Sequence, residues 1–198
     1  MSAPVYPAGG TIVQSFKRSF TDVPIDAANG NAISTTEFLE AAEAMTTMFD
    51  TLGSVAFSPV KKDILSNVAK LRVQQEAAPA ESGNVQDLCR NELKTKKHDA
   101  TEGALWLALT RNIANPSEEL ADSFRESYKG TLKPFHGFLI KPIFSAAMSA
   151  CPYRADFYTK LGDSPDLVTS ELTAYLDALT KIVTILQEFV KSKEAQWK

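Results

Sequence analysis

The stretch from Ser58 to Leu71 reads S-P-V-K-K-D-I-L-S-N-V-A-K-L and has the pattern of an amphipathic helix. Ser58 can cap the first free amides, and Pro59 suits the first helical position because it gives up a donor that has no intrahelical partner. At about 100° per residue, three polar side chains fall within about 60° of one another. These polar residues are Asp63, Asn67 and Lys70, and the apolar stripe beside them consists of Val60, Ile64, Val68 and Leu71.

The polar face of this helix combines an anionic acceptor, an amide and a cationic donor at the rim of an apolar stripe. A rim of this kind suits a neutral, hydroxyl-rich group that is joined to an apolar chain. A solvated helix surface is the simpler interpretation, and the helix taken alone favours it.

Length and composition limit the classes of protein to consider. A chain of 198 residues with 44% hydrophobic content predicts one domain, or at most two small ones, with a sizeable core. The net charge of -3 gives no general attraction to nucleic acid or to an anionic membrane. Cys89 and Cys151 make neither a disulfide framework nor a zinc site, and the sequence shows neither a leader peptide nor a membrane span. We expect a soluble cytoplasmic protein.

Helix start and stop signals occur along the chain, whereas strand-type alternation is absent. Proline and glycine residues predict a loose N-terminal arm over residues 1–30. A capping box from Ser34 to Glu37 opens a helix that runs to about Leu52 and closes at Gly53. The sequence therefore predicts an all-α fold, with further helices over residues 58–75, from 84 onward, over 117–129 and 154–161, and from 164 to the C-terminal region.

Two further side chains have both a core and a functional interpretation. Trp106 lies among leucine and alanine residues and is a core residue by default, but its side chain could also form a flat apolar plate for a ring. His136 falls on the same helical face as Ile140 and Ile143, in a segment that Pro142 should kink or split. A histidine on an apolar stripe is usually a hydrogen-bonded core residue, and a ligand contact is the alternative.

Motifs that carry catalysis are missing from the sequence. It has no nucleophile elbow, no phosphate-binding glycine loop, no H-E-x-x-H and no paired C-x-x-C. His98 and His136 are the only histidines, so an all-histidine metal site is excluded. The sequence predicts binding rather than catalysis, with no metal and no cofactor.

Three segments together resemble the glycolipid transfer protein family, most closely its fungal heterokaryon-incompatibility members. They are D-I-L-S-N-V-A-K from Asp63, A-L-W-L around Trp106, and the long segment from His136 to Phe157. The resemblance covers residues 31–198 and implies a two-layer sandwich of about eight helices that holds a ceramide between its layers. It further implies transfer of glycosphingolipids between membranes without covalent chemistry, with transient contact with the membrane surface and no nucleic acid partner.

The resemblance also implies roles for single residues. Asp63 and Asn67 would hold sugar hydroxyls and the ceramide amide, Lys70 would add donors to the sugar, and Trp106 would stack on its first ring. His136 would bind the ceramide linkage, with Trp197 close to it, and Phe138 would dock on the membrane. The apolar tunnel would be lined by Phe49, Phe57, Val60, Phe144 and Phe157.

One segment departs from the family pattern. After Trp106 and Leu107 the chain is about ten residues short, which corresponds to about 15 Å of helix in one wall. A shortened wall supports an alternative function, a lipid sensor or helical interaction protein that keeps the fold but transfers poorly. An enzyme centred on Asp63 and His136 is a third alternative.

Overall fold

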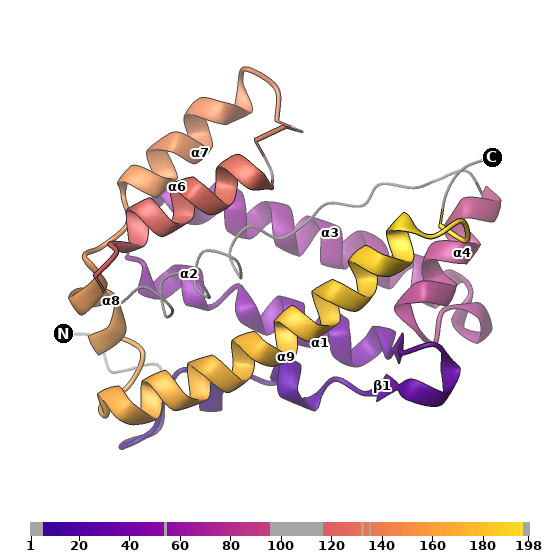
Figure 1. Ribbon diagram of the computed structural model, residues 1–198, viewed down its shortest axis with the longest axis horizontal. Coiled ribbons are helices and arrows are strands. Elements are labelled where there is room, and N and C mark those ends of the chain that lie inside the picture. Colours follow the sequence, from indigo (N-terminus) through magenta and orange to yellow (C-terminus); the bar gives the residue numbers. More distant parts are fainter. Residues whose placement is uncertain (1–5, 54, 96–116, 132, 135, 196–198) are drawn as a thin grey trace.

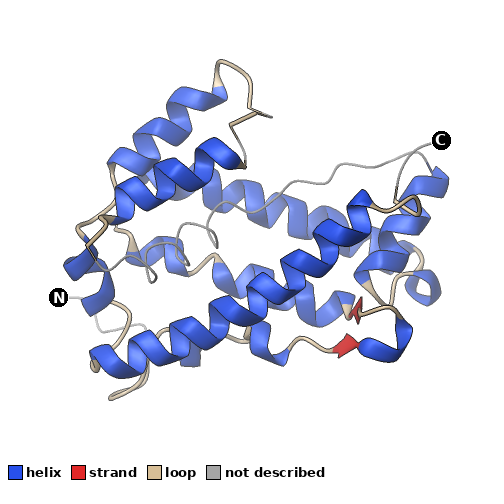
Figure 2. Cartoon of the chain, in the orientation of Figure 1, coloured by secondary structure: helices blue, strands red, loops and turns tan. Residues whose placement is uncertain are grey.

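The computed structural model describes residues 6–53, 55–95, 117–131, 133–134 and 136–195 (Figure 1). Regular structure in these residues is almost all helical (Figure 2), as the sequence predicts. None of the described helices combines the length and apolar content that crossing a bilayer requires. The α-helices are α1 (Thr35–Met45), α2 (Met48–Thr51), α3 (Ser58–Ala77), α4 (Val85–Thr95), α6 (Leu120–Gly130), α7 (Ile140–Ser149), α8 (Arg154–Thr159) and α9 (Pro165–Lys191).

Short elements connect these helices. Two residues each of β1 (Ile25–Asp26) and β2 (Ala32–Ile33) pair antiparallel, with Ile25 opposite Ile33. The 3₁₀ turns are η1 (Val13–Ser15), η2 (Phe20–Asp22), η3 (Ala27–Asn29), η4 (Val55–Phe57) and η5 (Pro79–Glu81).

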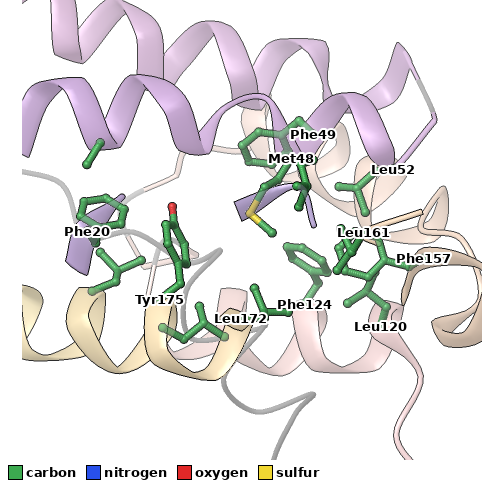
Figure 3. Close-up of a cluster of buried hydrophobic side chains, with 14 of the residues drawn as sticks. Phe20, Met48, Phe49, Leu52, Leu120, Phe124, Phe157, Leu161, Leu172 and Tyr175 are labelled. Atoms are coloured by element: carbon green, nitrogen blue, oxygen red, sulfur yellow. The ribbon is translucent and has the colours of Figure 1, made fainter. Parts of the chain in front are cut away.

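The helices form two layers around one apolar core. α1 packs against α3, while α9 crosses in front of α1 in Figure 1 and contacts η2. α6 packs against α7, and α7 contacts η4. Figure 3 shows Leu172 and Tyr175 of α9, with Phe124 of α6, facing Met48 and Phe49 of α2. This is the layered arrangement that the resemblance implies.

The start of α3 differs from its predicted start. Pro59 lies in the first turn, as expected, but Ser58 is already helical and its side chain caps nothing. Phe57 is the N-cap residue, with helical φ and ψ of −85° and −9°, because η4 leads directly into the helix. The predicted Ser58 cap is therefore wrong, although the helix itself is confirmed.

The predicted helix from Ser34 to Leu52 is two helices, α1 and α2, that meet at Thr46 and Thr47. The hydroxyls of these threonines donate to the carbonyl oxygens of Glu43 and Ala44 at 2.7 and 2.8 Å. Threonine hydroxyls that bind nearby carbonyls compete with continuous helical geometry. Gly53, with φ of +71°, follows α2 and ends the segment as predicted.

Residues 6–30 pack on the helices, and this corrects the expected loose arm. The Ile12 amide donates to the Leu161 carbonyl at 2.7 Å, and the Gly9 amide donates to Asp163 at 2.9 Å. Ile12 and Phe20 are almost fully buried, and the Phe20 ring lies 5.3 Å from that of Tyr175. Burial of these two apolar side chains stabilises the packed position of the segment. The proline and glycine content, on which the prediction of a loose arm rested, does not reveal this burial.

The segment around His136 also differs from expectation. α7 begins at Ile140, so His136 lies in the turn before it and does not share a helical face with Ile143. Pro142 is in the first turn of α7, where its missing amide hydrogen has no intrahelical partner to lose. The predicted kink is therefore absent from this helix. α6 likewise begins at Leu120 rather than at residue 117.

Candidate functional site

One side of the candidate site is the predicted polar face of α3. Asp63 and Lys70 are exposed and Asn67 is half-buried, and the Lys70 ammonium donates to the Asn67 side-chain oxygen at 3.4 Å. Asp63 makes no hydrogen bond or ion pair with any other residue that the structure describes. Its carboxylate can therefore accept hydrogen bonds from a ligand.

The other side is an imidazole held between two aromatic rings. The Tyr128 hydroxyl, from the end of α6, lies 3.1 Å from Nδ1 of His136. The Phe144 ring, from α7, lies with its centroid 4.4 Å from that of His136 and stacks on Tyr128 at 5.3 Å with an interplanar angle of 10°. We refer to Tyr128, His136 and Phe144 as the histidine cage.

Electrostatics connect the two sides. Burial lowers the pKa of His136, Asp63 acts in the opposite direction and Lys141 adds to the lowering. Burial raises the pKa of Tyr128, so its hydroxyl keeps its proton at neutral pH. The cage therefore contains a neutral imidazole and a neutral phenol within the field of the Asp63 carboxylate.

The residues predicted to line a tunnel lie in or against the apolar core. Phe49, Phe57 and Phe157 are 1–4% exposed, and the rings of Phe57 and Phe124 are 6.4 Å apart. Val60 and Phe144 are partly buried against the same cluster. Figure 3 shows Phe49 on one layer across from Phe124 and Phe157. The structure thus joins these side chains in one apolar cluster next to the histidine cage, and their role as a tunnel stays a prediction.

Phe138 lies on the surface, as a docking residue requires, with 81% of its area exposed. Its neighbours Leu139, Ile140 and Ile143 are also exposed large apolar residues. Val55 is 89% exposed and belongs to η4, which packs against α7. Large apolar side chains that gather on one surface indicate an interaction site.

Some of the predicted site residues lie outside the described part of the chain. Trp106, Trp197 and the shortened segment after Trp106 are not among the described residues. Tyr128 belongs to the site, although the sequence did not single it out. The available signal was its spacing of four residues from Phe124 on the inner face of α6, together with a hydroxyl that needs a partner when buried.

A hollow of about 280 Å³ lies away from these residues, where the end of α9 meets α4. Its lining includes Asn31, Gln86, Arg90, Phe189 and Glu194. No group of side chains suited to a metal ion occurs among the described residues. The described residues of the candidate site thus offer hydrogen-bonding groups beside an apolar core.

Comparison with known proteins places this arrangement in a family. The family model "Glycolipid transfer protein (GLTP)" matches residues 33–163, which is more than half of the chain. A glycolipid transfer protein of Aureobasidium melanogenum is 54% identical, over 97% of this chain and 98% of its own length. The chain belongs to the glycolipid transfer protein family.

Further relatives and solved structures resemble this chain. A glycolipid transfer protein of Danio rerio is 26% identical over 90% of each chain. The crystal structure of HET-C2, a fungal glycolipid transfer protein, superposes with a TM-score of 0.88 at 64% identity, covering 94% of this chain and all of that one. Human ceramide-1-phosphate transfer protein, at 14% identity and a TM-score of 0.75, shares the fold. The predicted family, its fungal branch and the all-α fold are confirmed.

Proposed function

We propose that this protein binds a glycosphingolipid and transfers it between membranes without covalent chemistry. The observation that carries the proposal is the placement of the Asp63 face and the histidine cage beside one continuous apolar cluster. Family membership supports it, because the Aureobasidium relative and HET-C2, which both match along nearly the whole chain, are glycolipid transfer proteins. We further propose that residues 31–198 form the transfer domain, that it acts in the cytoplasm and that it needs no cofactor.

The head group is held at the polar rim. Asp63 accepts from sugar hydroxyls and from the amide N–H, Asn67 adds an acceptor and a donor, and Lys70 donates to the sugar. His136 binds the amide linkage of the ceramide. The expected stacking of the first sugar on Trp106, and the approach of Trp197 to His136, belong to the same proposal.

A neutral sugar suits this rim better than a phosphate does. The Asp63 carboxylate repels an anion, and a polar group left unpaired at the rim costs about 1–3 kcal/mol. Asn67 and Trp106 likewise favour hydroxyl groups over a phosphate. Selectivity for the head group therefore follows from which lipid satisfies Asp63.

The two hydrocarbon chains occupy the apolar cluster. Exposing some 25 methylenes to water costs about 20 kcal/mol, whereas moving them from a bilayer to an apolar pocket is nearly neutral. Phe49, Phe57 and Phe157 are well packed, so a chain that lies among them must shift these rings. The lipid is drawn from the membrane where Phe138 and its exposed apolar neighbours enter the interface.

Transfer of fluorescent glucosylceramide between two vesicle populations tests the proposal. We expect Asp63→Val to reduce the transfer rate at least about tenfold, because it removes a charged acceptor and leaves ligand donors unpaired. Asp177→Val is the matched control, since Asp177 is an exposed carboxylate on α9. Equal transfer by the two variants would show that the site is wrong, and intact lipid recovered after transfer would show that no chemistry occurs.

A further inference from the structure

The hydrogen bond between Tyr128 and His136 bears on which imidazole nitrogen carries the proton as well as on the position of the ring. Tyr128 is 6% exposed, and Phe144 stacks on its ring, so its hydroxyl is held in place at 3.1 Å from Nδ1. Phe144 also packs against the imidazole. Tyr128 and His136 therefore both pack against the Phe144 ring and have little freedom to separate.

We propose that Tyr128 is a positioning residue that holds His136 in the tautomer with its proton on Nε2, an inference that rests on the proposed function. A phenol is a good donor, and an unprotonated imidazole nitrogen is a good acceptor, so the hydroxyl donates to Nδ1. The proton of the neutral ring is then on Nε2. The histidine presents an N–H donor to the ligand, and the carbonyl oxygen of an amide-linked lipid is the acceptor that fits it.

The same tautomer makes the two sides of the site complementary. Asp63 only accepts hydrogen bonds, and His136 in this form can only donate to the ligand. An amide offers one donor and one acceptor, whereas a lipid with a free ammonium group offers donors alone. The ammonium lipid leaves the His136 donor unpaired, so Tyr128 contributes to the preference for acylated lipids.

Imidazole ¹⁵N NMR of the full chain without lipid reads the tautomer directly. His136 should show a protonated Nε2 and an unprotonated Nδ1, with assignment from the signals that disappear in His136→Gln. In Tyr128→Phe, which keeps the ring and its stacking, we expect a mixture of both tautomers. Tyr175→Phe is the matched control, because Tyr175 is a buried tyrosine of the core whose hydroxyl has no partner among the described residues.

Binding adds a second readout that a merely structural role would not change. Tyr128→Phe should weaken binding of glucosylceramide about two- to tenfold but should not weaken binding of the deacylated amine form, whose ammonium group can donate to an unprotonated Nε2. A wild-type proton on Nδ1, or an unchanged tautomer in Tyr128→Phe, would overturn the inference. Absence of transfer by the wild-type protein would instead overturn the proposed function, because the tautomer is measured without lipid.

Discussion

The two sides of the candidate site are built in different ways. On α3, Asp63, Asn67 and Lys70 stand on one helix face and have few partners among the residues that the structure describes. At the cage, one imidazole is fixed by a hydrogen bond and two rings that come from α6 and α7. The first side can change its ligand contacts without affecting the fold, whereas the second side is part of the packing between α6 and α7.

Removing a wall of the cage should have the largest effect on stability. Phe144→Ala deletes a ring that packs on both Tyr128 and His136, so we expect the free energy of unfolding to fall by about 2–3 kcal/mol. Asn67→Ala on the α3 side should change it by less than about 0.5 kcal/mol. Urea denaturation of both variants measures the contrast, and equal losses would mean that the two sides do not differ.

For ligand binding, in contrast to stability, we expect a large effect from the α3 side, and Asp63→Asn tests this. It replaces a charged acceptor by a neutral amide of the same size, and a hydrogen bond to a charged group is worth about 1.5–3 kcal/mol. We expect glucosylceramide affinity to fall about 10- to 100-fold while the free energy of unfolding stays unchanged. A loss of stability comparable to the loss of affinity would show that Asp63 also supports the fold.

The same difference explains what the sequence could predict. Helix periodicity fixes which α3 side chains share a face, so Asp63, Asn67 and Lys70 could be grouped from their spacing alone. The pairing of Tyr128 with His136 depends on how the chain runs from the end of α6 at Gly130 to the start of α7 at Ile140, so no helical period relates the two residues. Competition from threonine hydroxyls at Thr46 and Thr47 and the run of η4 into α3 are local effects of the same kind. The Trp106 and Trp197 assignments remain predictions.

The shortened segment after Trp106 also remains a prediction. The alignment to the Aureobasidium relative extends over 201 positions, more than the 198 residues of this chain, so it contains gaps opposite that relative. Full glucosylceramide transfer by the wild-type chain would show that the tunnel tolerates the shorter wall. Binding without transfer would instead support the alternative of a lipid sensor.

A smaller effect is expected from the docking surface, which belongs to neither side of the site. Phe138→Ala removes an 81% exposed ring, and we expect vesicle binding to weaken by about 1–2 kcal/mol with no change in stability. Val73→Ala is the control, because Val73 is also exposed but lies towards the far end of α3. Vesicle sedimentation compares the two variants, and equal binding would remove Phe138 from the docking surface.

The smallest effect should come from pH and should act through the cage alone. Burial lowers the pKa of His136 below its ordinary value of 6.5, while Asp63 opposes this change and Lys141 adds to it. As pH falls through 6.5, the unfolded chain therefore takes up the proton before the folded one, and the free energy of unfolding decreases until the folded pKa is passed.

Protonation of His136 also places a hydrogen on Nδ1, where it faces the Tyr128 hydroxyl and ends the donation from that residue. In the wild type, the thermal unfolding temperature and the transfer rate should both decrease as the pH falls below about 6.5. His136→Gln has no imidazole to protonate, so this part of the pH dependence should disappear from its stability. Asp63→Asn keeps the cage but removes the carboxylate that favours the charged ring, so the folded pKa of His136 falls further. The loss of stability should then begin at the same pH as in the wild type, continue to lower pH and become larger. A pH dependence of stability in Asp63→Asn equal to that of the wild type would mean that the Asp63 side and the cage do not interact.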